Sequence, residues 1–202
     1  MSSTPGRQGS LRRSIEHRPV LQTQRMVIVI TGPIASGKST VARALARELE
    51  RVDVHSAVID LDHVYDMLVA NGSISDDATW MLARRGVATL ANTFLEEGVA
   101  VVIAEGSFNR PSDRVAFAQY LHSDADPVYV TLQVSFEEAL RRAQGDPTRG
   151  ISRDPGFLAS YFAAKGQVLE DVPATDFVID TERVTATSAA AAIAGLTRRA
   201  LD

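Results

Sequence analysis

Five short apolar runs along the chain predict buried strands. They occur at Met26–Thr31, Ala57–Asp60, Ala100–Ala104, Val128–Val134 and Asp176–Asp180. Valine and isoleucine are frequent in these runs, which favours extended backbone over helix. Each run also has the length of a buried strand and is far too short to cross a membrane.

Segments with helical periodicity separate the predicted strands. They are Lys38–Glu50, Leu61–Ala70, Asp77–Glu97, Arg114–Leu121, Phe136–Gln144, Gly156–Leu169 and Ala186–Leu201. Alternation of this kind predicts an α/β fold, in which a five-stranded parallel sheet lies between two helical layers as a three-layer α/β/α domain. Ligands bind such sheets beyond the carboxyl ends of the strands, so we expect functional residues directly after each strand.

The first predicted strand leads into a phosphate-binding loop. The loop has the spacing G-x-x-x-x-G-K-S and reads Gly32-Pro33-Ile34-Ala35-Ser36-Gly37-Lys38-Ser39. The backbone amides of such a loop surround a polyphosphate, so we expect ATP to bind at Gly32, Ala35, Ser36 and Gly37. Lys38 would reach the terminal phosphates, Ser39 would offer its hydroxyl to Mg²⁺, and Thr40 would lie near a more proximal phosphate.

Two aspartates follow the second predicted strand. Asp62 is the candidate to face the cleft, where it would orient a substrate hydroxyl or accept its proton during attack on the γ-phosphate. Asp60 would serve the water shell of Mg²⁺. The alternative is that both carboxylates cap the next helix. His63 is expected in the first turn of that helix, since one histidine beside acids does not make a metal site.

An acidic residue also follows the third predicted strand. Glu105 would reach Mg²⁺ through water or contact substrate, and the alternative is a structural hydrogen bond at the strand end. Gly106 indicates a close backbone approach at this point. The side chains of Asn109, Arg110 and Arg114 would either bind substrate or lie on a solvated helix face.

A segment rich in turn residues and arginine predicts a lid near residues 145–156. Arginines on a closing segment neutralise charge on the transferring phosphoryl group and exclude water, and Arg149 and Arg153 would take this role. The alternative is an ordinary charged surface loop. The acceptor pocket should lie over the end of the third strand, with Trp80 either lining it or packing in the core.

Composition narrows the class of protein. The 202 residues include no cysteine, which excludes disulfides, cysteine-based metal sites and a catalytic thiol, and the net charge of −4 argues against a nucleic-acid partner. Residues 1–25 are rich in serine, arginine and glutamine and predict a disordered or loosely docked arm before a domain at 26–202. A targeting segment is the alternative for the arm, and a cytoplasmic location is the simplest expectation.

The phosphate-binding loop, the Asp after the second strand and the stretch LRRAQGDPTRG at Leu140–Gly150 resemble those of small P-loop kinases. The likeness is strongest to shikimate kinases and the chloramphenicol phosphotransferase group. It implies that Arg142 stacks on adenine, that Arg149 contacts the phosphates from the lid, and that Asp62 touches the acceptor hydroxyl. Shikimate kinases have three glycines after the third strand, where this chain has Glu105-Gly106-Ser107. Lys165 falls near one position of their substrate-binding arginines.

The sequence therefore predicts an ATP-dependent kinase that transfers the γ-phosphoryl group to a hydroxyl of a small metabolite or antibiotic-like acceptor. The expected catalytic residues are Lys38, Asp62 and Arg149, and the expected cofactors are ATP and Mg²⁺. Two alternatives remain open at this point. A polynucleotide 5′-hydroxyl kinase would use the arginines of the arm, and a nucleotide-dependent switch or binding module would transfer no phosphoryl group.

Overall fold

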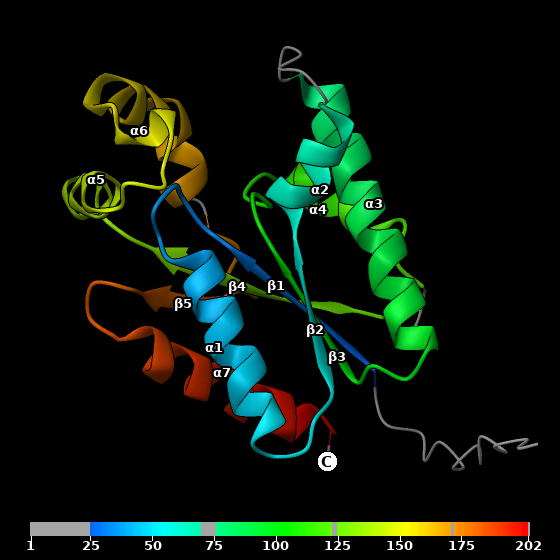
Figure 1. Ribbon diagram of the computed structural model, residues 1–202. Coiled ribbons are helices and arrows are strands. Elements are labelled where there is room, and N and C mark those ends of the chain that lie inside the picture. Colours follow the sequence, from blue (N-terminus) through cyan, green and yellow to red (C-terminus); the bar gives the residue numbers. More distant parts are fainter. Residues whose placement is uncertain (1–24, 70–75, 123–124, 171, 202) are drawn as a thin grey trace, which may run out of the picture.

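A five-stranded parallel sheet forms the centre of the protein in a computed structural model that describes residues 25–69, 76–122, 125–170 and 172–201 (Figure 1). The strands follow the order β2-β3-β1-β4-β5. Their bounds are Met26–Thr31 for β1, Ser56–Asp60 for β2, Val101–Glu105 for β3, Pro127–Gln133 for β4 and Phe177–Asp180 for β5. The predicted sheet is thus confirmed. The predicted arm lies outside the described residues, apart from Arg25.

Helices cover both faces of the sheet and rise above its carboxyl end (Figure 1). Helices α1 and α7 pack together on one face, and α2, α3 and α4 pack on the other. Helix α5, the short 3₁₀ helix η1 and α6 lie above the end of β4. The bounds are Lys38–Glu50 (α1), Leu61–Leu68 (α2), Asp77–Glu96 (α3), Pro111–Ala118 (α4), Phe136–Gly145 (α5), Ile151–Arg153 (η1), Pro155–Glu170 (α6) and Ala186–Leu201 (α7).

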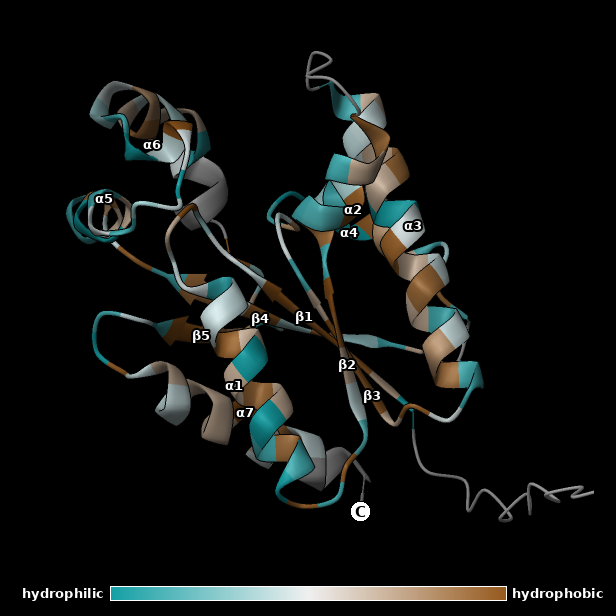
Figure 2. Ribbon diagram, viewed as in Figure 1, coloured by the Kyte–Doolittle hydropathy of each residue, from teal (hydrophilic) through white to brown (hydrophobic). Residues whose placement is uncertain are grey.

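Each helical layer buries its apolar face against the sheet. Figure 2 shows the strands as the hydrophobic centre, with hydrophilic positions on the outer surfaces of the helices. One cluster joins the sheet to α2, α3 and α4 and includes Phe108 and Phe117, and the other joins it to α1 and α7 and includes Leu45 and Ile193. Among the described residues, no helix is both long enough and apolar enough to cross a membrane.

One predicted helix starts earlier than its sequence pattern indicated. The expected helix Arg114–Leu121 begins at Pro111 as α4 and ends at Ala118. Proline is tolerated in the first turn of a helix, because the amide it lacks has no partner there. The Asp113 carboxylate also accepts a hydrogen bond from the Arg110 backbone amide at 3.1 Å, which holds the first turn closed.

The register of the sheet brings the functional strand ends to one edge. Asp60 of β2 lies opposite Glu105 of β3, and Glu105 lies opposite Ile30 of β1. Residues that follow these strands therefore meet above β1 and β3, although 24 residues separate β1 from β2 along the chain and 40 separate β2 from β3. Gly106 turns the chain away from this edge with a φ of +150°, and a Cβ there would lie 2.5 Å from Cβ of Leu61.

Candidate active site

The phosphate-binding loop joins β1 to α1 with backbone that requires small residues. Gly37 is in the left-handed region at φ 92° and precedes the first turn of α1. Ala35 also has a positive φ, of 62°. A Cβ on Gly32 would lie 2.5 Å from the carbonyl oxygen of Leu132, so the loop can pass this close to β4 only with glycine at that position.

Two side chains of the loop have the arrangement expected for binding phosphate. The Lys38 ammonium lies back over the loop and donates hydrogen bonds to the carbonyl oxygens of Gly32 and Pro33, at 3.2 and 3.1 Å. The Ser36 hydroxyl is buried and has no hydrogen-bond partner among the described residues. An unpartnered buried hydroxyl beside a helix N-terminus fits an anion, since both it and the backbone amides can donate to oxygen.

Glu105 is a buried carboxylate beside the loop. Its residue is only 3% exposed, and it accepts a hydrogen bond from the Ser39 side chain. Burial raises the pKa of Glu105 to about 7, because desolvation penalises the charged form, and the charges of Asp60 and Asp62 add to the effect. The structural hydrogen bond of the alternative is therefore present, and the magnesium role of Glu105 stays a prediction.

Asp60 and Asp62, at the end of β2, differ in their contacts. Asp60 is the N-cap of α2, and its Oδ1 accepts hydrogen bonds from the amides of Asp62 and His63 at 2.8 and 3.4 Å. His63 lies in the first turn, as predicted. Asp62 makes no cap, and its carboxylate lies within the electrostatic field of the Lys38 ammonium.

Lys38 and Asp62 influence each other across the cleft. Burial lowers the pKa of Lys38, while the charges of Asp62 and Glu105 oppose that shift. The Asp62 side chain reaches solvent, yet the protein around it desolvates the carboxylate enough to raise its pKa, and Lys38 opposes this effect. A carboxylate with a raised pKa is a stronger proton acceptor than a free one, which suits a general base.

The residues at this edge fit a magnesium ion. Three carboxylates, Asp60, Asp62 and Glu105, share one electrostatic environment, and a divalent cation would relieve their repulsion. The described residues contain no cluster of three or more histidine, aspartate and glutamate side chains arranged to hold a metal. Magnesium in such sites keeps several waters and uses one or two protein ligands plus phosphate oxygens, and Ser39 is placed to be one ligand.

A cavity of about 380 Å³ opens beside the loop. Three segments form it: the loop with the start of α1, the end of α5 with the residues after it, and the connection from β5 to α7. The residues that line it are Ala35, Ser36, Gly37, Thr40, Val41, Arg142, Asp146, Arg149, Thr181, Val184, Thr185, Ala186 and Ala189. Its volume and its position suit the base and ribose of a nucleotide whose phosphates lie on the loop.

The three arginines predicted to bind nucleotide occupy different positions. Arg142 donates to Glu138 at 2.7 Å and to the Thr181 carbonyl oxygen at 2.8 Å, so it fixes one wall of the cavity. Arg149 also lines the cavity, and its positive charge helps to lower the pKa of Lys38. Arg153 is exposed on η1 and forms no ion pair with a described residue.

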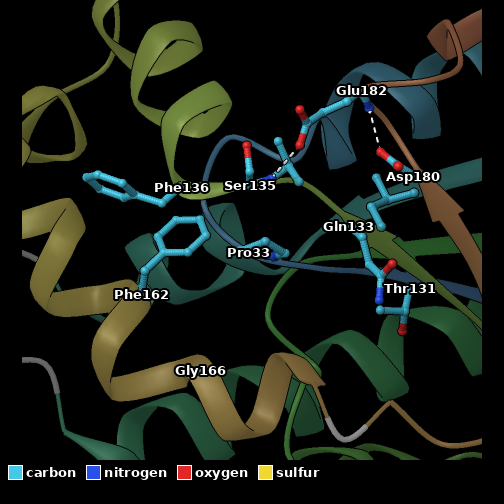
Figure 3. Close-up of a pocket in the computed structure, with 11 residues that line it drawn as sticks. Pro33, Thr131, Gln133, Ser135, Phe136, Phe162, Gly166, Asp180 and Glu182 are labelled. Atoms are coloured by element: carbon cyan, nitrogen blue, oxygen red, sulfur yellow. Dashed lines mark hydrogen bonds between the residues drawn. The ribbon is translucent and has the colours of Figure 1, made fainter.

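A second cavity, of about 390 Å³, lies between β4 and α6 (Figure 3). Phe136 and Phe162 approach each other at one end, with ring centroids 5.7 Å apart. At the other end Glu182 accepts a hydrogen bond from the Ser135 amide at 2.6 Å. None of the predicted catalytic residues lines this cavity, although Pro33 of the phosphate-binding loop does.

Several residues near the third strand are structural. Arg114, for which the sequence left substrate binding or a solvated face open, does not lie on a solvated face, since its side chain is only 13% exposed. It donates two hydrogen bonds to the buried Asp176, at 2.6 and 2.7 Å. Asn109 is buried and accepts a hydrogen bond from the Thr31 hydroxyl at 2.8 Å. Trp80 stacks on Tyr65 with ring centroids 3.9 Å apart and packs against the core, which supports the packing alternative.

Sequence reasoning missed two groups of site residues. The first is the connection from Thr181 to Ala189, which completes the nucleotide cavity. The only sequence feature that could have identified this connection was its position directly after the last strand. The second is the face of α6 that carries Tyr161, which lies near Asp62 and hydrogen-bonds with the backbone of Ile34. No motif marks that face, because its role arises only when α6 folds over the sheet.

Comparison with known proteins places the chain in a family. A family model described as AAA domain matches residues 27–151. An adenylyl-sulfate kinase of Bacillus pumilus is 38% identical over 155 residues, which cover 77% of this chain and 76% of that protein. A probable adenylyl-sulfate kinase of Archaeoglobus fulgidus is 33% identical over 78 residues, and that match spans only 50% of the relative's length.

Solved structures share the fold at low sequence identity. Shikimate kinase from Acinetobacter baumannii has a TM-score of 0.55 and 18% identity, with 88% of this chain and 95% of that one covered. The tunicamycin resistance protein of Deinococcus radiodurans has a TM-score of 0.59 and 18% identity, with 86% and 95% covered. The resemblance to small P-loop kinases is thus confirmed. The chain belongs to the AAA domain family, and its similarity to adenylyl-sulfate kinases supports a P-loop kinase.

Proposed function

We propose that the protein transfers the γ-phosphoryl group of ATP to a hydroxyl group of a small molecule. The observation that carries this proposal is the position of Asp62. Its carboxylate shares the field of Lys38 at the phosphate-binding loop, and the helix-capping role that would explain an acid here belongs to Asp60 instead. A carboxylate in this position is what phosphoryl transfer to a hydroxyl requires.

In the proposed mechanism the loop amides and Lys38 bind the β- and γ-phosphates, and Arg142 and Arg149 border the rest of the nucleotide. Ser39 would hold Mg²⁺ directly and Glu105 and Asp60 would hold it through water, and the ion would supply charge neutralisation on the phosphate oxygens. Asp62 orients the acceptor hydroxyl and accepts its proton as the hydroxyl oxygen attacks the γ-phosphorus. The bond from that phosphorus to the bridging oxygen breaks, and ADP leaves.

The predicted lid completes this mechanism. Arg149 belongs to the segment at 145–156 and already lies within electrostatic range of Lys38. A small movement of this segment toward the phosphates would add a second cation to the transferring group and exclude water from it. Arg153 starts from an exposed position, so it would need a larger movement to take part.

The test is release of ADP from Mg²⁺·ATP with a panel of hydroxylated acceptors. Shikimate, gluconate, chloramphenicol, an aminoglycoside, a nucleotide sugar and a 5′-hydroxyl oligonucleotide belong in the panel, and adenylyl sulfate joins them because of the relatives' names. We expect turnover that depends on one acceptor class. Lys38→Ala should lower kcat by about 10²- to 10³-fold, because a preorganised cation on the phosphates is lost.

Asp62→Asn examines the proposed base directly. Asparagine keeps the size of the side chain but cannot accept a proton, so we expect kcat to fall by about 10²- to 10⁴-fold while ATP still binds. Glu97→Gln is the matched control, since Glu97 is exposed at the opposite end of the sheet and its loss should leave turnover unchanged. Unchanged kcat in Asp62→Asn would remove the base from this mechanism.

The two alternatives lead to different results in the same assay. Turnover with the oligonucleotide alone, falling steeply as salt is added, would identify a polynucleotide kinase. Tight binding of ATP with no acceptor-dependent release of ADP would support a nucleotide-dependent switch.

A further inference from the structure

One peptide unit of the phosphate-binding loop is held from both sides. It is the unit that joins Pro33 to Ile34. Its carbonyl oxygen accepts hydrogen bonds from the Lys38 ammonium at 3.1 Å and from the Ser36 amide at 3.2 Å. Its N–H group, which belongs to Ile34, forms a hydrogen bond with the side chain of Tyr161 on α6. The first two bonds lie within the loop, whereas the third ties the loop to a helix that lies above it (Figure 1).

The Tyr161 hydroxyl accepts this third hydrogen bond. Burial raises the pKa of Tyr161 to about 12, so the phenol keeps its proton at neutral pH, and the hydrogen bond with Ile34 opposes the rise. A hydrogen bond lowers the pKa of a phenol when it stabilises the charged form, which means that a donor approaches the oxygen. The Ile34 amide is that donor.

Apolar contacts hold α6 on the loop independently of this hydrogen bond. They form a small cluster of Ala35, Ala139, Ala143 and Leu158, against which Ile34 and Tyr161 pack. Leu158 is fully buried and lies about one helical turn before Tyr161. Leu158 therefore anchors α6 in the cluster, and the Tyr161 ring adds to the packing. The Tyr161 hydroxyl contributes a polar contact that this packing does not require.

Rotation of the Pro33–Ile34 peptide would break the bonds on both of its sides. The C=O and N–H groups of a trans peptide point in opposite directions, so Lys38 and Tyr161 hold this unit from opposite sides. The next residue, Ala35, has a positive φ of 62°, which costs a non-glycine residue free energy and needs support from its surroundings. Without the Tyr161 hydroxyl, the orientation of the peptide would depend on hydrogen bonds from the loop itself.

We propose that Tyr161 is a positioning residue for Lys38. Its hydroxyl fixes the orientation of the Pro33–Ile34 peptide, and the carbonyl oxygen of that peptide holds the lysine ammonium over the loop. A cation stabilises a transferring phosphoryl group best when it is already in place before the reaction. This inference rests on the proposed function, because Lys38 acts there on the phosphoryl group.

The first test measures hydrogen exchange of the Ile34 amide by NMR in the nucleotide-free protein. Tyr161→Phe keeps the ring and its packing but removes the oxygen that accepts from this amide. We expect the Ile34 amide to exchange about tenfold faster or more, because it loses its partner. An exchange rate equal to that of the parent protein would overturn the proposal.

Tyr129→Phe is the matched control. Burial raises the pKa of Tyr129 to about 12, as it does for Tyr161, but the Tyr129 hydroxyl has no hydrogen-bond partner among the described residues. Tyr129 lies on β4 and packs against the cluster that joins the sheet to α2, α3 and α4. Exchange of the Ile34 amide should therefore stay as in the parent protein. An equal acceleration in both variants would overturn the proposal.

The second test asks whether Tyr161 acts through Lys38. Calorimetry measures the affinity for the ATP analogue AMPPNP with Mg²⁺ in the parent protein, Tyr161→Phe, Lys38→Ala and the double variant. We expect Tyr161→Phe to weaken binding by about 3- to 10-fold when Lys38 is present, and by less than about twofold when it is absent, since the peptide then holds no ammonium. Equal weakening in both backgrounds, or none in either, would overturn the proposal.

Neither test needs phosphoryl transfer, so failure of this inference is distinguishable from failure of the proposed function. In an active kinase, Tyr161→Phe should also lower kcat by about 3- to 10-fold and leave KM for the acceptor unchanged, because a misplaced Lys38 affects the transferring phosphoryl group. The expected results of both tests without any acceptor turnover would support the inference and leave the kinase proposal to fail alone. An active kinase in which Tyr161→Phe changes neither Ile34 exchange nor AMPPNP affinity would overturn the inference alone.

Discussion

Two buried carboxylates of this protein have opposite electrostatic surroundings. The Asp176 side chain, just before β5, is 0% exposed and accepts two hydrogen bonds from Arg114, at 2.6 and 2.7 Å. The Thr131 hydroxyl donates a third. Arg114 also lies over the ring of Tyr129, 4.3 Å from its centroid. Every charge in this cluster, which we call the Asp176 cluster, has its partner within the chain.

Glu105 has a different environment. It receives one hydrogen bond from Ser39, and its neighbours include the acids Asp60 and Asp62 and a single lysine, Lys38. Its pKa of about 7 reflects burial without sufficient compensation. We call these residues the Glu105 cluster. The cluster has an excess of negative charge, and it lies beside a loop with the arrangement expected for binding negatively charged phosphates.

The difference indicates what each cluster does. A buried ion pair with all of its hydrogen bonds made holds elements together, and here it joins α4, β4 and the start of β5. A buried acid whose pKa is strongly raised, in a group with too few cations, is typical of a functional site. The comparison leads to variants with opposite effects on stability.

Breaking the Asp176 cluster should have the largest effect on folding. Asp176→Asn leaves the Arg114 guanidinium buried without its counter-charge, so we expect the free energy of unfolding to fall by about 3–5 kcal/mol in urea titrations. The double variant Arg114→Met with Asp176→Leu removes both charges and should lose much less. A double variant as unstable as the single one would show that packing, not the unpaired charge, causes the loss.

Removing the charge of Glu105 should instead raise the free energy of unfolding. The folded pKa of Glu105 is about 7 and its ordinary value is 4.5, so the folded protein binds more protons than the unfolded chain between these values. Its free energy of unfolding therefore falls as the pH rises from about 4.5 to 7. Glu105→Gln removes this dependence and should stabilise the nucleotide-free protein at pH 8 by about 1–3 kcal/mol.

The same variant should lose activity. Glutamine still accepts the Ser39 hydrogen bond but cannot carry negative charge, so we expect Mg²⁺-dependent turnover to fall by about 10- to 100-fold. Urea titrations at pH 5 and pH 8 and a magnesium titration of kcat measure both effects on one protein. A Glu105→Gln protein that is less stable than the parent at pH 8 would contradict the functional assignment of this cluster.

The two clusters also show what could be predicted from the sequence. The loop, the strands and the acids at the strand ends depend on short segments, so local pattern was enough to find Asp60, Asp62 and Glu105. Arg114 and Asp176 are 62 residues apart, and their pairing exists only in the folded chain. For this reason the sequence left Arg114 between substrate binding and a solvated face, and it did not find the ion pair with Asp176.

Distance along the chain explains the other omissions as well. The nucleotide cavity combines the loop with residues after β5. The part after β5 has no motif, because its residues lie beside the loop only in the folded chain.

Asp60 has features of both clusters, and its substitution should give the smallest change in the free energy of unfolding. It caps α2 within the chain, and its charge also contributes to the raised pKa of Glu105. Asp60→Ala removes the cap, and we expect it to lower the free energy of unfolding by about 1 kcal/mol. Asp60→Asn keeps a side-chain oxygen that can accept the same amides, so its stability should stay within a few tenths of a kcal/mol of the parent.

The magnesium dependence of turnover then separates the helix-capping role of Asp60 from a role on the magnesium water shell. If Asp60 contributes charge to that shell, Asp60→Asn should weaken the magnesium dependence of turnover by about tenfold although the helix is intact. Asp76→Ala is the control, because Asp76 caps α3 by accepting from the Thr79 amide at 2.7 Å and is exposed. It should cost similar stability and leave magnesium dependence unchanged. An Asp60→Asn protein with the parent's magnesium dependence would assign Asp60 to the fold alone and leave Glu105 and Ser39 to hold the metal.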